Sequence, residues 1–174
     1  TDAPTYLGGM ASSTFRDLRE HREALRDATV RAGFFPIGME NDTAKGADVI
    51  DSSLAMVGRA AAVFLVIGRK YGQTPKDPEH NPTQLSITEL EFNEAIRLDR
   101  PIRFYDMATE HLLPDGQTEL NTTNRRKLEA FRKRARERAR EAVPGGVHRV
   151  WDSFTSAADF RAKVTQALAE LRES

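Results

Sequence analysis

The feature of the sequence that most constrains the fold is an unbroken apolar run, AAAVFLVI, over residues 60–67. A run without polar alternation is typical of a strand that is buried on both faces, as in the centre of a parallel sheet. Gly68 ends the run, and a polar loop follows. We therefore expect this strand to lie at the centre of a sheet with layers packed on both sides.

Strand-like and helix-like segments alternate five times along the chain. The expected strands cover residues 5–11, 34–39, 60–67, 102–107 and 147–151. The expected helices cover a segment that follows residues 12–14 and ends near 32, residues 47–59, a segment from about 87, residues 124–143 and a segment from 156. Alternation of this kind indicates one α/β domain with helices on both faces of a parallel sheet. Right-handed crossovers then favour a flavodoxin-like, three-layer fold with strand order 2-1-3-4-5.

Size and composition limit the classes of function. The chain has 174 residues, of which 39% are apolar and 30% are charged, and this composition is typical of a globular domain. Its formal net charge is zero, so the overall charge does not indicate binding to nucleic acid or to a membrane. The absence of cysteine excludes disulfides and thiolate catalysis. No apolar run has the length of a membrane span, and no signal peptide is visible, so we expect a cytoplasmic protein. Because residue 1 is Thr and not Met, we expect an excised piece of a longer protein.

The helix after residue 86 carries the main candidate for chemistry. Ser86 and Glu89 have the spacing of a capping box, which predicts a helix start near Ile87. On a helical wheel Glu91 falls on the apolar arc with Ile87 and Ala95, and Glu89 falls near its outer edge. A carboxylate on an inward face is costly unless it is paired or lines a pocket. Glu91 is therefore either bonded to a neighbouring element or part of a ligand site at the carboxyl ends of the strands.

Polar residues also occur in two loops that we expect at the carboxyl ends of the strands, one after the first strand and one after the strand that ends at residue 67. The first strand-to-helix turn contains Ser12, Ser13 and Thr14. At such a turn, hydroxyls and free backbone amides can hold a phosphate or a ribose. The alternative is that these side chains only cap the helix. Arg16 and Arg69 lie near the same edge, where each either faces an anionic ligand or is solvated.

Several other chemistries are disfavoured. The sequence contains no GxxxxGK[ST] loop, no GxGxxG after the first strand and no GxSxG elbow. The histidines show no metal-ligand spacing, so we expect no metal site and mostly surface positions for His21, His80, His111 and His148.

The helix expected over residues 124–143 is strongly basic. Its apolar stripe contains Leu128 and Phe131, and lysines and arginines cover the rest. These charges form either a solvated face or a docking surface for an acidic partner or nucleic acid. No aromatic residues alternate with the arginines, so nucleic acid is the less favoured partner.

Four segments in this order carry a family resemblance: SSTFRDLREHREAL at 12–25, GFFPIGME at 33–40, VFLVIGRKYG at 63–72 and SITELEFNEAIRLDRPI at 86–102. Together they resemble a TIR-like domain family, long catalogued as a domain of unknown function, over about residues 5–107. Gly8 and Gly9 replace larger residues of its first strand. Such domains are often fused in front of STAND-type NTPase and repeat modules. The resemblance implies a signalling or bacterial-defence effector that acts through self-association or a fused oligomerising module.

A more distant similarity bears on mechanism. Nucleoside 2-deoxyribosyltransferases carry a GTxxE motif at a helix start, then Ala and Lys-Pro, and the matching positions here are Thr88, Glu91, Ala95, Arg100 and Pro101. Ile87 replaces the glycine. TIR-domain NAD hydrolases place an essential glutamate on the corresponding helix. The resemblance therefore implies that Glu91 is a catalytic carboxylate in N-glycosidic bond cleavage, with Glu89 as the alternative.

The same resemblance implies a nucleotide-type ligand, with NAD as substrate and no required cofactor. The binding residues that it implies are Ser12, Ser13, Thr14, Phe15, Arg16, Gly68, Arg69, Tyr71 and Thr88. The alternative is a non-catalytic interaction module that couples a STAND-type NTPase to its effector or partner. An accessible cleft at Glu91 would favour the enzyme, and a filled cleft would favour the module.

Overall fold

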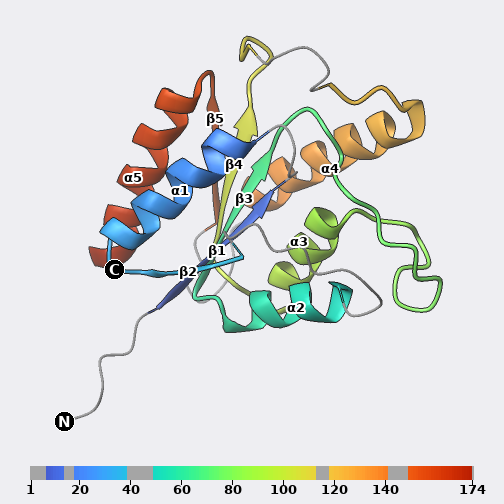
Figure 1. The fold of residues 1–174 in the computed structure, drawn as a ribbon, viewed down its shortest axis with the longest axis horizontal. Coiled ribbons are helices and arrows are strands. Elements are labelled where there is room, and N and C mark those ends of the chain that lie inside the picture. The colour runs from blue at the N-terminus through green and yellow to red at the C-terminus, as the bar shows by residue number, and fades with distance from the viewer. Residues whose placement is uncertain (1–6, 14–17, 39–48, 113–117, 141–148, 174) are drawn as a thin grey trace.

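A computed structural model describes residues 7–13, 18–38, 49–112, 118–140 and 149–173 of the 174-residue chain. Strands and helices alternate along it, as Figure 1 shows. The elements are β1 (Gly8–Ser13), α1 (Arg19–Arg31), β2 (Phe35–Ile37), α2 (Val49–Arg59), β3 (Ala62–Ile67), α3 (Ile87–Arg97), β4 (Ile102–Met107), α4 (Thr122–Arg140), β5 (Arg149–Phe154) and α5 (Ala157–Glu173).

The five strands form one sheet with order β2-β1-β3-β4-β5, and all neighbouring pairs are parallel. This confirms the predicted α/β class and strand order. Helices α1 and α5 cover one face of the sheet, and α2, α3 and α4 cover the other (Figure 1). The carboxyl ends of β1, β3 and β4 therefore meet at one edge, where loops leading to helices begin.

Strand β3 explains why the sheet needs two helical layers. All six of its residues are buried, because alternate side chains enter opposite cores. Val63, Leu65 and Ile67 pack with residues of α2, α3 and α4, whereas Phe64 and Val66 pack with residues of α1 and α5. The apolar run of the sequence is thus a central strand, as predicted.

Two glycines in β1 replace the larger residues expected from the family resemblance. A Cβ on Gly8 would lie 2.3 Å from Cδ1 of Ile37, and one on Gly9 would lie 3.4 Å from Cγ2 of Thr29. Gly8 therefore lets β2 pack closely against β1, because Ile37 occupies the space that a side chain at position 8 would fill, whereas a Cβ at position 9 would make only ordinary van der Waals contact.

Element boundaries differ from the predictions mainly at the first and last strands. Ser13 is the last residue of β1 and not a helix cap, and α1 begins only at Arg19, with Leu18 at the N-cap position and no side-chain cap bond. Strand β5 covers Arg149–Phe154 and so continues past residue 151, whereas residues 147 and 148 of the predicted strand lie outside the described residues. The cap of α3 is as predicted: Ser86 Oγ accepts from the Glu89 amide at 3.2 Å.

The basic helix α4 is held to the sheet by a buried carboxylate. Asp106, near the carboxyl end of β4, is 1% exposed and accepts hydrogen bonds from both Arg132 and Arg136. Arg132 also donates to the carbonyl of Gly68 at 2.7 Å, and the Arg136 guanidinium lies over the ring of Trp151. Arginines on one side of α4 are therefore structural, while Lys133 remains exposed.

No helix in the described ranges is long and apolar enough to cross a membrane.

Asp106→Ala should destabilise the protein by about 3 to 5 kcal/mol, because it leaves the buried Arg132 guanidinium without its carboxylate. The change in unfolding free energy is measured by urea denaturation. The control is Asp152→Ala on β5, whose exposed side chain forms a 3.6 Å ion pair with Lys163 and should contribute less than about 1 kcal/mol. Equal effects of the two substitutions would contradict the role given to Asp106.

Candidate functional site

The candidate site is built around a hydrogen bond between β1 and α3. Ser12 Oγ donates to Glu91 Oε1 at 2.8 Å, although the two residues are 79 positions apart. Ser12 is 1% exposed and Glu91 6% exposed. Strand β1 ends at Ser13, so this pair lies at the edge where parallel strands leave the sheet, the usual place of ligand sites in such folds.

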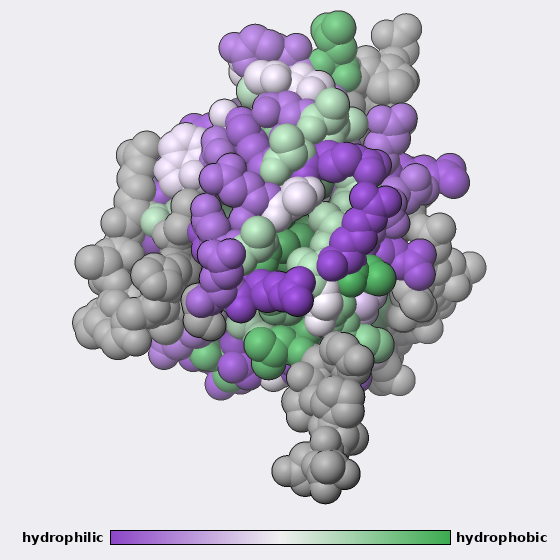
Figure 2. All heavy atoms as spheres, turned by 90° about the vertical axis from the view of Figure 1, so that its left-hand side faces the viewer, coloured by the Kyte–Doolittle hydropathy of each residue, from purple (hydrophilic) through white to green (hydrophobic). Residues whose placement is uncertain are grey.

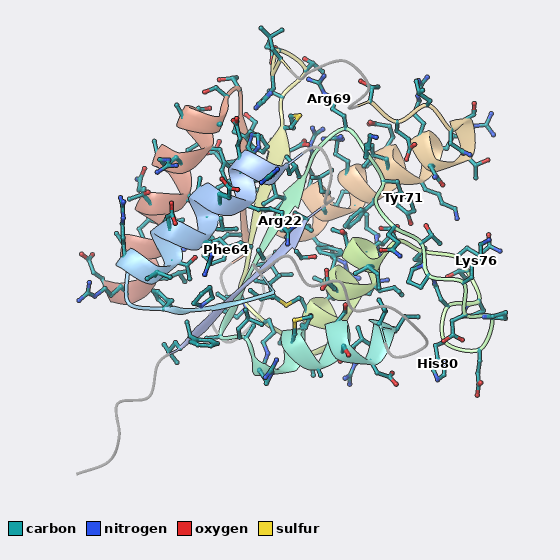
Figure 3. All side chains as sticks on the ribbon, in the orientation of Figure 1. Arg22, Phe64, Arg69, Tyr71, Lys76 and His80 are labelled. Atoms are coloured by element: carbon teal, nitrogen blue, oxygen red, sulfur yellow. The ribbon has the colours of Figure 1, made fainter. Side chains whose placement is uncertain are left out.

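A cation faces this pair from α1. Arg22 lies close enough to Glu91 for each to perturb the other, and its guanidinium also donates to the carbonyl of Gly38 at 3.4 Å. Figure 3 shows Arg22 extending from α1. Burial lowers the pKa of Arg22, and the charge of Glu91 opposes that change. Glu91 thus has a hydroxyl donor on β1 and a positive charge on α1.

Burial dominates the electrostatics of Glu91. Desolvation raises the pKa of its carboxyl from 4.5 to about 8, against smaller lowering effects of the Ser12 hydrogen bond and the Arg22 charge. The protonated form of this carboxyl is therefore favoured at neutral pH. A group with its pKa near the working pH is suited to acid–base chemistry.

Glu89, the second predicted carboxylate, belongs to a separate network and does not lie at an outer edge. It is 9% exposed, because α4 and the loop after β3 cover it. Tyr71 Oη donates to Glu89 Oε1 at 2.6 Å, and Arg134 donates to Oε2 at 2.8 Å. The Tyr71 hydroxyl also accepts from the Ser86 amide at 3.1 Å, so these contacts fix the start of α3 against α4.

Other residues named from the sequence have structural partners. Gly68 supplies the carbonyl that Arg132 binds, and the Arg69 guanidinium donates to the carbonyls of Ala108, Thr109 and His111, each at 2.9 Å. Figure 3 shows Arg69 and Tyr71 on the segment that follows β3.

The remaining predicted residues divide into two groups. Thr88 is buried in the first turn of α3, one turn before Glu91, and Ser13 is half-buried beside Ser12. Thr14, Phe15 and Arg16 lie outside the described residues.

Sequence reasoning missed two buried histidines, which were expected at the surface. His21 Nε2 lies 3.0 Å from His111 Nε2, and both rings pack against Phe154. His111 Nδ1 lies 2.9 Å from the carbonyl of Leu112 and must donate to it, so in neutral rings His111 Nε2 accepts from His21. Burial, aided by His111, lowers the pKa of His21 to about 4, which keeps that ring neutral at physiological pH.

The missed residues left little local signal. Arg22 is one of several arginines in α1, and only its position one turn after the buried Leu18 marks it as inward-facing. His21 and His111 meet across 90 positions of sequence, which no local pattern predicts. The described part of the chain contains no cluster of three or more His, Asp or Glu side chains arranged to hold a metal ion.

The sequence matches the family described as "Domain of unknown function (DUF4062)" over residues 10–169. The chain belongs to this family. The match to DUF4062 extends beyond residue 107, where the resemblance seen in the sequence ends, and includes α4, β5 and most of α5. No curated protein matches the chain. The DUF4062 description assigns no activity, so the case for a function rests on the geometry of the site.

Glu91→Gln should stabilise this DUF4062 domain increasingly as the pH rises from 4.5 to 8. The folded chain keeps a proton on Glu91 that the unfolded chain releases above pH 4.5, so this carboxyl lowers wild-type stability as the pH rises towards its folded pKa of about 8. Glutamine carries no such charge. The difference in unfolding free energy should grow by roughly 1 kcal/mol per pH unit in this window.

The measurement is urea unfolding of both proteins at several pH values, with the exposed Glu137→Gln as control. A difference between wild type and Glu91→Gln that stays constant from pH 4.5 to 8 would show that Glu91 is ionised in the folded chain.

Proposed function

We propose that this chain is a TIR-like effector domain that hydrolyses the N-glycosidic bond of NAD or a related nucleotide. The observation that carries the proposal is the Glu91 carboxyl, buried at the carboxyl end of the sheet with Ser12 as its donor and its pKa raised to about 8. The resemblance of the Thr88–Glu91 segment to a motif of N-glycosidic bond chemistry supports the same assignment.

The chemistry needs a carboxylate that becomes charged when the substrate arrives. The nicotinamide of NAD is cationic, and a positive charge beside Glu91 favours the ionised form of the carboxyl. As the bond between the sugar and the ring breaks, the electron pair leaves with nicotinamide and positive charge develops on the sugar. A fixed carboxylate stabilises this charge. Water then adds its hydroxyl to the anomeric carbon, and its remaining proton passes to Glu91 or to solvent.

Residues around Glu91 are suited to the rest of such a substrate. Ser13 ends β1 as a half-buried residue, and Arg22 carries a positive charge close to Glu91. Hydroxyl donors suit ribose, and a guanidinium suits a phosphate. No metal or cofactor enters the proposed reaction. In the full protein, we propose that a fused oligomerising module such as a STAND-type NTPase brings copies of this domain together.

A second candidate function is a non-catalytic module that couples a STAND-type NTPase to its effector or partner. The small exposure of Glu91, 6%, and its bond to Ser12 favour this reading, because a buried and bonded carboxyl also serves to join β1 to α3. Under this reading, substitution of Glu91 changes stability or partner binding alone.

The test is incubation of the full-length, activated protein with NAD, followed by measurement of free nicotinamide. We expect cleavage by the wild type and a loss of at least about a hundredfold in Glu91→Gln, equivalent to a few kcal/mol of barrier. Glu89→Gln is the matched control, since it lies on the same helix and its carboxylate binds Tyr71 and Arg134.

Two results would contradict the assignment. Full activity of Glu91→Gln with none in Glu89→Gln would place the chemistry on the other carboxylate. No cleavage by the activated wild type, together with no NAD-dependent shift of the Ser12 or Glu91 amide signals in NMR spectra, would favour the interaction module.

A further inference from the structure

A pocket far from Glu91 lies between α1 and α5, on the opposite face of the sheet from α3. Its volume is about 480 Å³, within the range of small-molecule sites. Alanines of both helices form its floor, among them Ala28, Ala32 and Ala169. Figure 2 shows this side of the molecule with a hollow of more apolar side chains bordered by hydrophilic ones.

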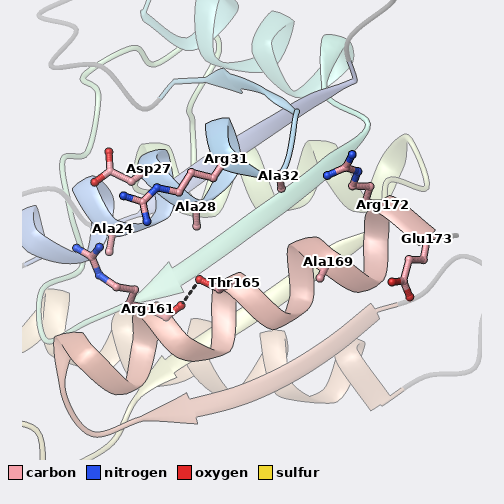
Figure 4. A pocket seen from close by; sticks show the side chains of 10 residues that line it. All are labelled: Ala24, Asp27, Ala28, Arg31, Ala32, Arg161, Thr165, Ala169, Arg172 and Glu173. Carbon is pink, nitrogen blue, oxygen red and sulfur yellow. Dashed lines mark hydrogen bonds between the residues drawn. The ribbon is translucent and has the colours of Figure 1, made fainter.

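Three arginines surround this alanine floor. Arg31 extends from α1, and Arg161 and Arg172 extend from α5, as Figure 4 shows. Among the described residues, none of the three guanidiniums has an ion-pair or hydrogen-bond partner, and all three side chains belong to exposed residues. Two acidic residues, Asp27 and Glu173, also line the pocket, so its lining carries three positive charges and two negative ones. The net charge of the pocket lining is therefore positive.

The spacing of the arginines indicates an elongated occupant. Arg161 and Arg172 are eleven residues apart on one helix, which corresponds to about 16 Å along its axis. Because the two side chains leave the helix that far apart, one phosphate or carboxylate contacts both guanidiniums only if the two side chains bend toward each other. An α-helix of about eleven residues has this length and carries charges at both ends. Alanines of the floor allow a helix to approach closely, because they present no long side chains.

We propose that the α1–α5 groove binds an amphipathic helix of a partner protein, with small apolar residues on its inner face and carboxylates along its edges. The apolar face would cover Ala28 and Ala169, and the carboxylates would pair with Arg31, Arg161 and Arg172. Helix-in-groove binding of this kind places anchor residues three and four positions apart. The groove lies on the opposite face from Glu91's helix, so it offers a way to recruit a partner that does not depend on the proposed catalysis.

The probe is a synthetic helical peptide of glutamate, alanine and leucine, with the glutamates on both edges of one apolar face. A second peptide with lysine at every glutamate position is the sequence-matched control. Each is titrated into the 15N-labelled 174-residue chain at low salt, and binding is also followed by fluorescence anisotropy. We expect the acidic peptide alone to shift amide signals around Ala28 and Ala169.

Charge reversal then tests the groove. Arg161→Glu combined with Arg172→Glu should weaken the acidic peptide at least tenfold. Arg126→Glu combined with Lys133→Glu changes net charge equally on exposed sites of α4 and should leave binding within about twofold.

Four outcomes would overturn the proposal: no shift at millimolar acidic peptide, shifts confined to α4, equal weakening in both double variants, or equally tight binding of inorganic triphosphate. A concentration-dependent dimer in sedimentation, lost in the Arg161/Arg172 variant, would assign the groove to a second copy of the chain and overturn it as well.

Discussion

The candidate site depends on one hydrogen bond in a place that excludes water. Ser12 donates to Glu91 across 79 residues of sequence, because the parallel order of β1 and β3 brings the end of β1 beside α3. Desolvation of this carboxyl outweighs both the hydroxyl donor and the charge of Arg22. Glu91 is thus costly for stability at neutral pH.

A second set of charged groups fixes the elements around that site. Asp106 holds Arg132 and Arg136, and Glu89 holds Arg134, so three arginines of α4 bind carboxylates on β4 and α3. The two sets differ in how their charge is balanced. Glu89 and Asp106 have direct arginine partners, whereas Glu91 has a neutral hydroxyl donor and a cation nearby. Glu89 and Asp106 therefore join elements of the fold through charge-assisted hydrogen bonds, which Glu91 does not form with Ser12.

Much of the fold was predictable because its signals are local. The apolar run ending at Ile67 marks the central strand, and Ser86 marks the start of α3. The meeting of Ser12 and Glu91 followed from topology, since both were placed at the carboxyl edge. The burial of Glu89 and the His21–His111 pair were not predictable, because they depend on side chains 45 and 90 positions away. Likewise, the basic pattern of α4 did not reveal which of its arginines bind carboxylates within the domain.

The most direct test of this account is the titration of the Glu91 carboxyl itself. The side-chain carboxyl 13C shift of selectively labelled protein is followed from pH 4 to pH 10, with Glu91→Gln used to assign the signal. The account predicts a single step centred near pH 8, moved to higher pH when Arg22 is replaced by methionine, because the lowering effect of its charge is lost. A step at or below pH 4.5 in the folded protein would show that Glu91 is an ordinary ionised carboxylate and would contradict the account.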